Sequence, residues 1–387
     1  MWRSYFADRN YRIFYLHSFG DSIATRLTQI FTGVYLYSAG MPLHFIFLFW
    51  GFEFGLRGLL APLGPALFSK IGLTKTIYLS YALLIVYFLL VGSAGFSLPI
   101  AFSAFIFHAF AKAIYYPCID GLHALLIHEN SRGRQSSVEI ALMSLAGLIA
   151  VGLGTVVLTL YSFWVLACIV AVILLFAGSV VGRLDTRPQT PLRVYDSYAH
   201  FTSSSFRPYL LPLGAYSLAI IANIFAAPLF IFIGVGTLET FGLVIGAALL
   251  VELAVVLAAG AAVDKYQQSR VAPIVVGLQS LGNIAYLFLK GNPVHAFAVS
   301  AFNTNAWNAL RNNFETRMQR EAKQSGSALL FMAAGQMALC FAEVIALSIF
   351  ALIAYWHQLA VFPIIFIASV IGLWIAERTL FGRNTTE

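Results

Sequence analysis

The stretch from Ile140 to Gly182 reads IALMSLAGLIAVGLGTVVLTLYSFWVLACIVAVILLFAGSVVG and contains no Asp, Glu, Lys or Arg. A helix needs roughly 20 predominantly apolar residues to cross a bilayer, so this run is long enough for two such helices joined by a turn. Further runs without these four residue types occupy 76–111, 208–238, 271–289 and 344–376. The pattern predicts a polytopic α-helical membrane protein.

The composition of the whole chain supports the same class. Of its 387 residues, 60% are hydrophobic and only 10% are charged, whereas soluble domains are about 25% charged. The formal net charge is +7, which in a soluble protein would suggest a nucleic-acid partner. Basic residues collect in the cytoplasmic loops of membrane proteins, so we expect the lipid bilayer and no nucleic acid as the partner.

The cysteines indicate neither a metal site nor a disulfide. Cys118, Cys168 and Cys340 each lie in an apolar stretch and lack the spacing of metal ligands. We therefore expect them to be small core residues, and we expect no metal and no cofactor.

Twelve spans account for the apolar runs and for the Gly, Pro and Ser clusters that mark the turns between them. They are placed at 12–38, 43–68, 73–95, 98–126, 138–160, 162–182, 208–235, 238–262, 271–289, 293–313, 326–353 and 359–377.

The distribution of basic residues predicts the orientation of these spans. Nineteen of the 23 Lys and Arg residues lie in the N-terminal segment, the C-terminal segment or the connections that follow even-numbered spans, and only Lys290 lies on the other side. Because Lys and Arg favour cytoplasmic loops, both termini are expected to be cytoplasmic. We expect a bacterial inner membrane.

The longest polar connection, from Arg183 to Arg207, lies between the sixth and seventh spans and contains Pro188 and Pro191. It divides the chain into an N-terminal bundle (1–183), a cytoplasmic linker (184–206) and a C-terminal bundle (207–387). The expected fold is all-α, with twelve transmembrane helices in two pseudo-symmetric bundles of six.

Two segments at similar offsets support an internal duplication. Gly260-Ala-Ala-Val-Asp264-Lys265-Tyr-Gln-Gln-Ser-Arg270 follows the eighth span, and Gly64-Pro-Ala-Leu-Phe68-Ser-Lys70-Ile-Gly72-Leu-Thr-Lys75 follows the second. With these segments, and with Tyr115-Tyr116-Pro117 in span four, the chain resembles the major facilitator superfamily. It departs from the family pattern at Phe68, where that pattern has Asp. The resemblance implies secondary transport by alternating access, with spans one, four, seven and ten lining a central cavity.

Charges near the cytoplasmic helix ends are interpreted as gating residues. Asp264, Lys265 and Arg270 carry the motif after span eight, and Asp120 lies near the end of span four. We expect them to hold helices together in one state of the transport cycle.

Charged side chains inside spans are the main functional candidates, because burying a charge in lipid costs a few kcal/mol or more. Asp21, Glu53 and His108 are the candidates for proton coupling. Asp21 and Arg26 are five residues apart and point in different directions on a helix, so Asp21 has no simple partner along its own helix. Alternatively, Asp21 forms a fixed ion pair with Arg57 or Lys112, and Glu53 and Arg57 form an i,i+4 pair.

Cationic and polar side chains at membrane depth are the candidates for substrate binding. Arg26 and Lys112 on cavity-lining spans suggest an anionic group on the substrate, or they balance Asp21 and Glu53. The full set of candidate substrate contacts is Arg26, Arg57, Lys112, Tyr115, Asn223, Asn303 and Asn308.

The expected function is secondary active transport of a small anionic or amphiphilic organic solute, coupled to protons. The contrast between a charged first half and an apolar span seven suggests an amphiphilic solute. Alternatives are a lipid flippase, an exporter of hydrophobic drugs, and a non-transporting receptor or scaffold. An enzyme is not expected, because the chain has no nucleotide-binding loop, metal cluster or nucleophile constellation. We expect the protein to be a monomer.

Overall fold

The protein is described here by a computed structural model, which covers residues 9–94, 97–126, 132–184, 191–265, 268–289 and 291–380. Within these ranges the side chains at 28, 94, 132–134, 136–137, 257–265 and 268–270 are not described.

The described part of the chain is helical and contains no strand. Nine of its helices are long and apolar enough to cross a membrane by length and composition. The chain is therefore an all-α, multi-pass membrane protein, as the charge-free runs predicted.

The helices before the linker are α2 (Arg9–Ser38), α3 (Leu43–Leu60), α4 (Leu63–Ile71), α5 (Leu73–Ala94), α6 (Leu98–Leu126), α7 (Arg132–Leu160) and α8 (Phe163–Val181). Those from the linker onward are α9 (Val194–Thr202), α10 (Arg207–Ile220), the π-helical turn η2 (Ile221–Ala226), α11 (Ala227–Val235), α12 (Leu238–Lys265), α13 (Gln268–Tyr286), α14 (Pro293–Gln324), α15 (Ala328–Trp356), the 3₁₀ turn η3 (Gln358–Ala360) and α16 (Val361–Leu380).

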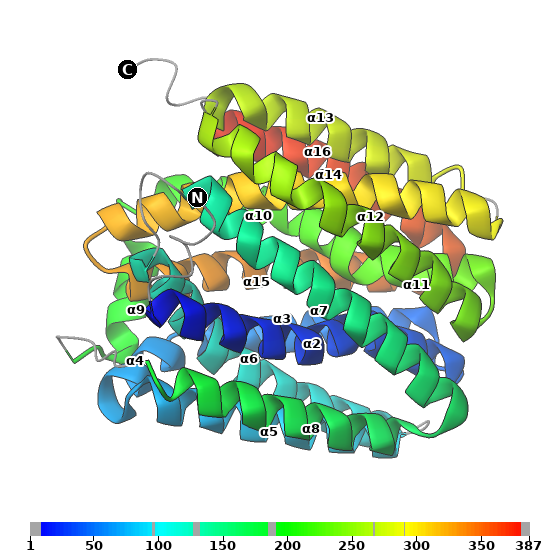
Figure 1. Cartoon of the computed structure of the whole chain (residues 1–387), viewed down its shortest axis with the longest axis horizontal. Helices are drawn as coiled ribbons and strands as arrows, with labels where there is room; N and C mark the ends of the chain where they lie inside the picture. The colour runs from blue at the N-terminus through cyan, green and yellow to red at the C-terminus, as the bar shows by residue number, and fades with distance from the viewer. Residues whose placement is uncertain are drawn as a thin grey trace.

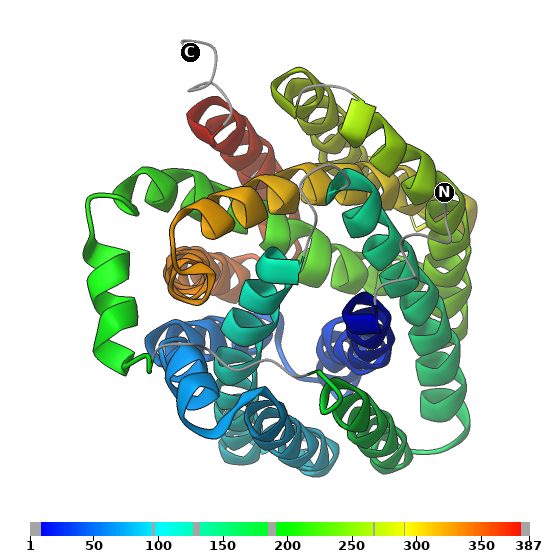
Figure 2. The same ribbon diagram turned by 60° about the vertical axis from the view of Figure 1, so that its left-hand side comes forward.

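The long helices lie side by side in one bundle, as Figure 1 shows. The short helix α9 lies at the end of the bundle where α2 begins, and it runs along the outside (Figure 2). We call this end the α9 end. It is the end that the distribution of basic residues predicts to be cytoplasmic.

Helix contacts follow the same pattern in both parts of the chain. The helix α2 packs on α7 and α8, α3 packs on α6, and α5 packs on α6 and α8. After the linker, α10 packs on α15 and α16, α12 packs on α14, and α13 packs on α14 and α16. When α2, α3 and α5–α8 are numbered one to six, and α10 and α12–α16 are numbered likewise, the same positions are paired in both parts. The strongest contacts between the two parts, α7 with α12 and α3 with α15, correspond in the same way.

Glycine and proline set the tight turns between helices. Gly40, in the turn before α3, has φ +88°, and Gly291, before α14, has φ +65°, conformations that side chains with a Cβ rarely adopt. At the start of α14, the Asn292 side-chain oxygen accepts a hydrogen bond from the Val294 backbone N–H at 2.9 Å. Pro293 occupies the first helical turn, where a missing N–H costs nothing.

The structure differs from the sequence-based expectation at two connections. The tenth span was expected to end near residue 313, but α14 continues to Gln324. The ion pairs Arg311–Glu315 and Arg317–Glu321, at i,i+4 spacing, support this extra length. The linker contains α9, whose first turn is closed by the Arg193 N–H donating to Asp196 at 2.7 Å.

Close packing of α16 on α10 leads to a stability prediction. A Cβ atom at Gly372 would overlap the backbone carbonyl oxygen of Ala215, so Gly372→Ala should destabilise the protein by about 1–3 kcal/mol. A lower thermal unfolding midpoint in detergent would show this. Gly277 has no atom within 4 Å of the same position, so Gly277→Ala is the matched control. Equal midpoints for the two variants would contradict the packing argument.

Candidate functional site

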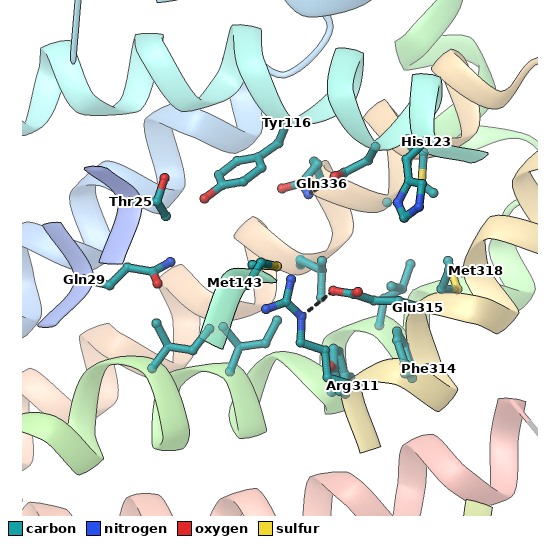
Figure 3. A pocket seen from close by; sticks show the side chains of 18 of the residues that line it. Thr25, Gln29, Tyr116, His123, Met143, Arg311, Phe314, Glu315, Met318 and Gln336 are labelled. Carbon is teal, nitrogen blue, oxygen red and sulfur yellow. Dashed lines mark hydrogen bonds and ion pairs between the residues drawn. The ribbon is translucent and has the colours of Figure 1, made fainter. Parts of the chain in front are cut away.

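The main cavity has a volume of about 260 Å³ and lies between the two parts of the bundle. Its walls come from α2, α3, α6 and α7 on one side and from α10, η2, α14 and α15 on the other. Figure 3 shows Arg311 and Glu315 from α14 pointing into it opposite Tyr116 and His123 from α6. The charged side chains among the described lining residues are Asp21, Arg26, Arg57, Asp120, Glu139, Arg311, Glu315 and Glu343.

Asp21 faces this cavity and is 7% exposed. The Thr25 hydroxyl donates to Asp21 Oδ2 at 3.2 Å, and the Lys112 ammonium donates to the same hydroxyl at 3.0 Å. Asp21 Oδ1 has no hydrogen-bond partner among the described atoms. Thr25 thus separates Asp21 from Lys112, and the Tyr81 and Tyr115 hydroxyls also lie beside the Asp21 carboxylate.

Glu53 and His108 are not among the residues that line the main cavity. They line a smaller neighbouring cavity of about 30 Å³, whose walls come from α2, α3, α5, α6 and Phe225 in η2. His108 Nδ1 is 3.2 Å from Glu53 Oε1, and Arg57 Nη1 is 3.8 Å from the same oxygen. Lys112 also lines this small cavity, over the rings of Tyr115 and Tyr116. The proton-coupling candidates therefore divide between two cavities.

Arg57 connects the two parts of the chain. Its Nη2 donates to Gln336 Oε1 on α15 at 2.8 Å, and Gln336 Nε2 donates to Asp120 Oδ2 on α6 at 3.1 Å. The guanidinium also lies over the rings of Phe54 and Tyr116. This bridge places Asp120 between the two parts, which suits the gating role expected for it.

Arg26 lines the main cavity and also a second cavity of about 70 Å³. The carboxylate that attracts it most strongly is Glu252 on α12. Glu252 is fully buried and accepts a hydrogen bond from the Ser144 hydroxyl on α7. Arg26 therefore already has a counter-charge within the protein.

The amide candidates surround the second cavity in the later part of the chain. Asn223 and Asn308 line it together with Asn303. Gln279 Nε2 donates to Asn223 Oδ1 at 2.8 Å and to Asn303 Oδ1 at 3.0 Å, and Asn303 Nδ2 donates to Asn223 Oδ1 at 2.6 Å. Asn223 belongs to the π-helical turn η2, a distortion often found at functional sites.

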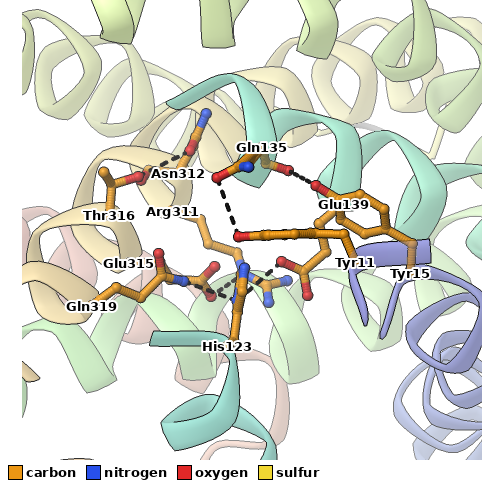
Figure 4. Close-up of polar contacts among 10 residues, drawn as sticks. All are labelled: Tyr11, Tyr15, His123, Gln135, Glu139, Arg311, Asn312, Glu315, Thr316 and Gln319. Atoms are coloured by element: carbon orange, nitrogen blue, oxygen red, sulfur yellow. Dashed lines mark hydrogen bonds and ion pairs between the residues drawn. The ribbon is translucent and has the colours of Figure 1, made fainter. Parts of the chain in front are cut away.

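A polar cluster joins α6, α7 and α14 near the α9 end (Figure 4). His123 Nδ1 is 3.2 Å from Glu139 Oε2 and 3.1 Å from Gln319 Nε2. Arg311 Nε donates to Glu315 Oε1 at 2.6 Å. Because α6 and α7 precede the linker and α14 follows it, this cluster also spans the two parts of the chain.

Aromatic pairs fill the interface at the opposite end of the bundle. Phe31 on α2 packs edge-on against Phe241 on α12, with ring centroids 6.1 Å apart, and Tyr37 packs against Phe232 on α11 at 6.4 Å. Closer to the middle, Trp50 on α3 lies 4.9 Å from Phe225 in η2. These contacts hold the two parts together beyond the main cavity.

Tyr115 is not among the residues that line the main cavity. Tyr115 is buried, and its hydroxyl lies 3.2 Å from His17 Nε2. The side chains of Asp264, Lys265 and Arg270 lie outside the described residues.

Several cavity residues were missed by sequence reasoning. The α14 set, Trp307, Arg311, Phe314, Glu315 and Met318, was assigned to the end of a span and to a loop. Their spacing of three and four residues is that of one helix face, and this signal could have identified the wall. Glu343 on α15 is 1% exposed, with Oε2 unpaired among the described atoms, and only the interhelical packing places it at the cavity.

Comparison with models of known protein families finds no match, and comparison with curated proteins finds no significantly similar sequence.

Proposed function

We propose that the protein is a secondary active transporter of the major facilitator type, which moves a small amphiphilic organic solute by alternating access and is coupled to protons. The observation that carries this proposal is the charged cavity of about 260 Å³ between the two parts of the bundle. A solute held there would touch both parts, so their relative movement would change its access to the two sides of the membrane.

The repeated pattern of helix contacts supports a twelve-span arrangement in two halves. The two longest helices that fail the apolar criterion for a span, α2 and α14, both line the main cavity. Polar residues within a membrane are tolerated where they face a cavity, so this lining explains the polarity of these helices. We therefore count them, with α13, as spans.

The aromatic contacts hold the two parts together at one end of the bundle, and the main cavity lies toward the α9 end. We assign this arrangement to one of the two states of an alternating-access cycle. In the opposite state, the pairs Phe31–Phe241 and Tyr37–Phe232 would separate, and the parts would close at the α9 end. The bridge from Arg57 through Gln336 to Asp120 would then rearrange, because it crosses the same interface.

Solute-driven proton movement tests this function directly. The purified protein is placed in liposomes that contain the pH-sensitive dye pyranine, and gradients of amphiphilic cations, anions and neutral solutes are imposed in turn. At least one class should change the internal pH faster than in protein-free liposomes. Solute entry without any proton movement would contradict the coupling, and no protein-dependent flux of either kind would contradict transport.

The topology of this proposal is tested by thiol labelling. Ser204, in the exposed connection between α9 and α10, should face the cytoplasm. In a variant without native cysteines, Ser204→Cys should react with a membrane-impermeant maleimide only after the inner face is exposed. Tyr161→Cys, in the exposed turn between α7 and α8, should react in intact cells and is the matched control. The reverse pattern would contradict the orientation.

A further inference from the structure

Three carboxylates meet near the α9 end of the main cavity, where Asp120 (α6) and Glu139 (α7) face Glu315 (α14). We call them the acidic cluster. These carboxyl groups are buried and lie close enough for their charges to interact, Asp120 with Glu315 and Glu139, and Glu139 with Glu315. The guanidinium that faces all three is Arg311, which is already bound to Glu315 at 2.6 Å. Like charges held together in a cavity are unfavourable unless a cation or a proton joins them.

Two further polar atoms at this cluster lack a partner among the described atoms. Gln319 is 4% exposed, and its Oε1 is buried with no donor. His123 is 6% exposed, and its Nε2 is likewise unpaired. Both residues line the cavity. Because a buried acceptor without a donor costs free energy, Gln319 Oε1 independently indicates a ligand that donates a hydrogen bond.

Parallel aromatic rings line the cavity next to the acidic cluster. Tyr216 on α10 stacks on Phe314 with ring centroids 3.8 Å apart and on Trp307 at 5.7 Å, and all three residues line the cavity. Along α14, Trp307 precedes Arg311 by four residues, and Phe314 directly precedes Glu315. Aromatic faces bind both the rings of a ligand and its positive charge.

Carboxyl groups outnumber guanidinium groups in the described lining of the cavity. Its described lining includes five carboxylates and three guanidiniums. Two of the guanidiniums lie beside a carboxylate, because Arg311 pairs with Glu315 and Arg57 Nη1 is 3.8 Å from Glu53 Oε1. Lys112, which suggested an anionic substrate, lines the small cavity and not this one.

We propose that the transported solute is a small aromatic ammonium ion. Its N–H groups are bound by Asp120, Glu139 and Gln319 Oε1, and its ring lies against Trp307, Tyr216 and Phe314. This inference rests on the proposed function for the statement that the bound ion is transported, but the binding itself is independent of it.

The test uses three probes with one biphenyl frame: biphenyl-4-methylammonium, biphenyl-4-methanol and biphenyl-4-carboxylate. Binding of radiolabelled probe to the full chain in detergent is measured by equilibrium dialysis. The ammonium should bind more tightly than the alcohol, and the carboxylate should bind least. Glu139→Gln and Asp120→Asn should each weaken ammonium binding at least about tenfold, with alcohol binding unchanged.

Two further variants separate charge from structure. Glu139→Asp keeps the carboxylate and should restore most of the preference for the ammonium. Glu239→Gln makes the same chemical change at an exposed site in the first turn of α12 and should bind all three probes as the unchanged protein does. Equal loss of ammonium and alcohol binding in both acidic-cluster variants would overturn the inference, because it would indicate lost structure and not lost charge.

The outcomes also distinguish this inference from the proposed function. Tighter binding of the carboxylate than of the ammonium, or no binding of the ammonium, would overturn the ligand class and leave transport to be judged by proton flux. Ammonium binding that depends on Glu139, without its flux into liposomes, would support the site and contradict transport.

Discussion

A disulfide between α7 and α12 should abolish transport. An ideal Cβ at Gly242 lies 3.0 Å from the Thr155 Cβ, and disulfides join Cβ atoms about 3.8 Å apart, so a shift of under about 1 Å suffices. Thr155 and Gly242 lie near the end of the bundle that the aromatic pairs close. In Thr155→Cys/Gly242→Cys, with the native cysteines replaced, oxidation should reduce solute flux to that of protein-free liposomes, and dithiothreitol should restore it.

A second cysteine pair provides the matched control for this experiment. An ideal Cβ at Gly20 on α2 lies 3.1 Å from the Ala177 Cβ on α8, and both helices precede the linker. Gly20→Cys/Ala177→Cys should therefore form a disulfide that leaves the two halves free to move, and flux should persist. Full flux in the oxidised α7–α12 pair, with the disulfide confirmed by mass spectrometry, would rule out alternating access at this interface.

Asp21→Asn should eliminate transport driven by a pH gradient while solute exchange without a gradient continues. Asp21 faces the main cavity, and its Oδ1 has no partner among the described atoms. An amide keeps the size of the side chain and can accept from the Thr25 hydroxyl, but it cannot gain or lose a proton. Coupling should therefore fail although the cavity remains intact. Uptake into proteoliposomes with and without an imposed pH gradient measures the difference.

The same uptake measurements on two other variants complete this test. Glu239→Gln makes the equivalent change at an exposed position and should couple normally. If Asp21→Asn keeps normal pH-driven uptake, Asp21 is not the coupling group. Glu53→Gln would then be tested next, since Glu53 and His108 are 3.2 Å apart in the small cavity.

Charged candidate residues named from the sequence divide between two cavities. Asp21, Arg26 and Arg57 were selected because they are charged at membrane depth, and Asp120 was selected because it lies near a cytoplasmic helix end. All four line the main cavity. Lys112, Glu53 and His108 were also selected for their position at membrane depth, but they lie around the small cavity. The depth of a charged residue in the membrane can be read from its position along one helix. Which of the two cavities it lines depends on how α2, α3 and α6 are rotated against one another.

The α14 wall shows a second limit of sequence reasoning. Residues 314–324 are mostly polar, so an apolar window ended the span near 313 and left Glu315 and Gln319 in a loop. In the structure these residues continue the helix, supported by the Arg311–Glu315 and Arg317–Glu321 pairs, and turn one face to the cavity. The hydropathy of a window averages over all faces of a helix, so it cannot show that one face meets a polar cavity.

The sequence alone determined that this protein lies in a lipid bilayer and that it is helical. Runs such as Ile140–Gly182 can only be helices in lipid, because about 20 apolar residues satisfy both the bilayer thickness and the backbone hydrogen bonds. The tertiary structure decided which charges meet. The bridge from Arg57 through Gln336 to Asp120 joins residues more than 200 positions apart. The contact of His123 on α6 with Gln319 on α14 joins residues 196 positions apart. Lipid burial depends on the composition of one local segment, whereas an ion pair depends on distances set by the packing of several helices.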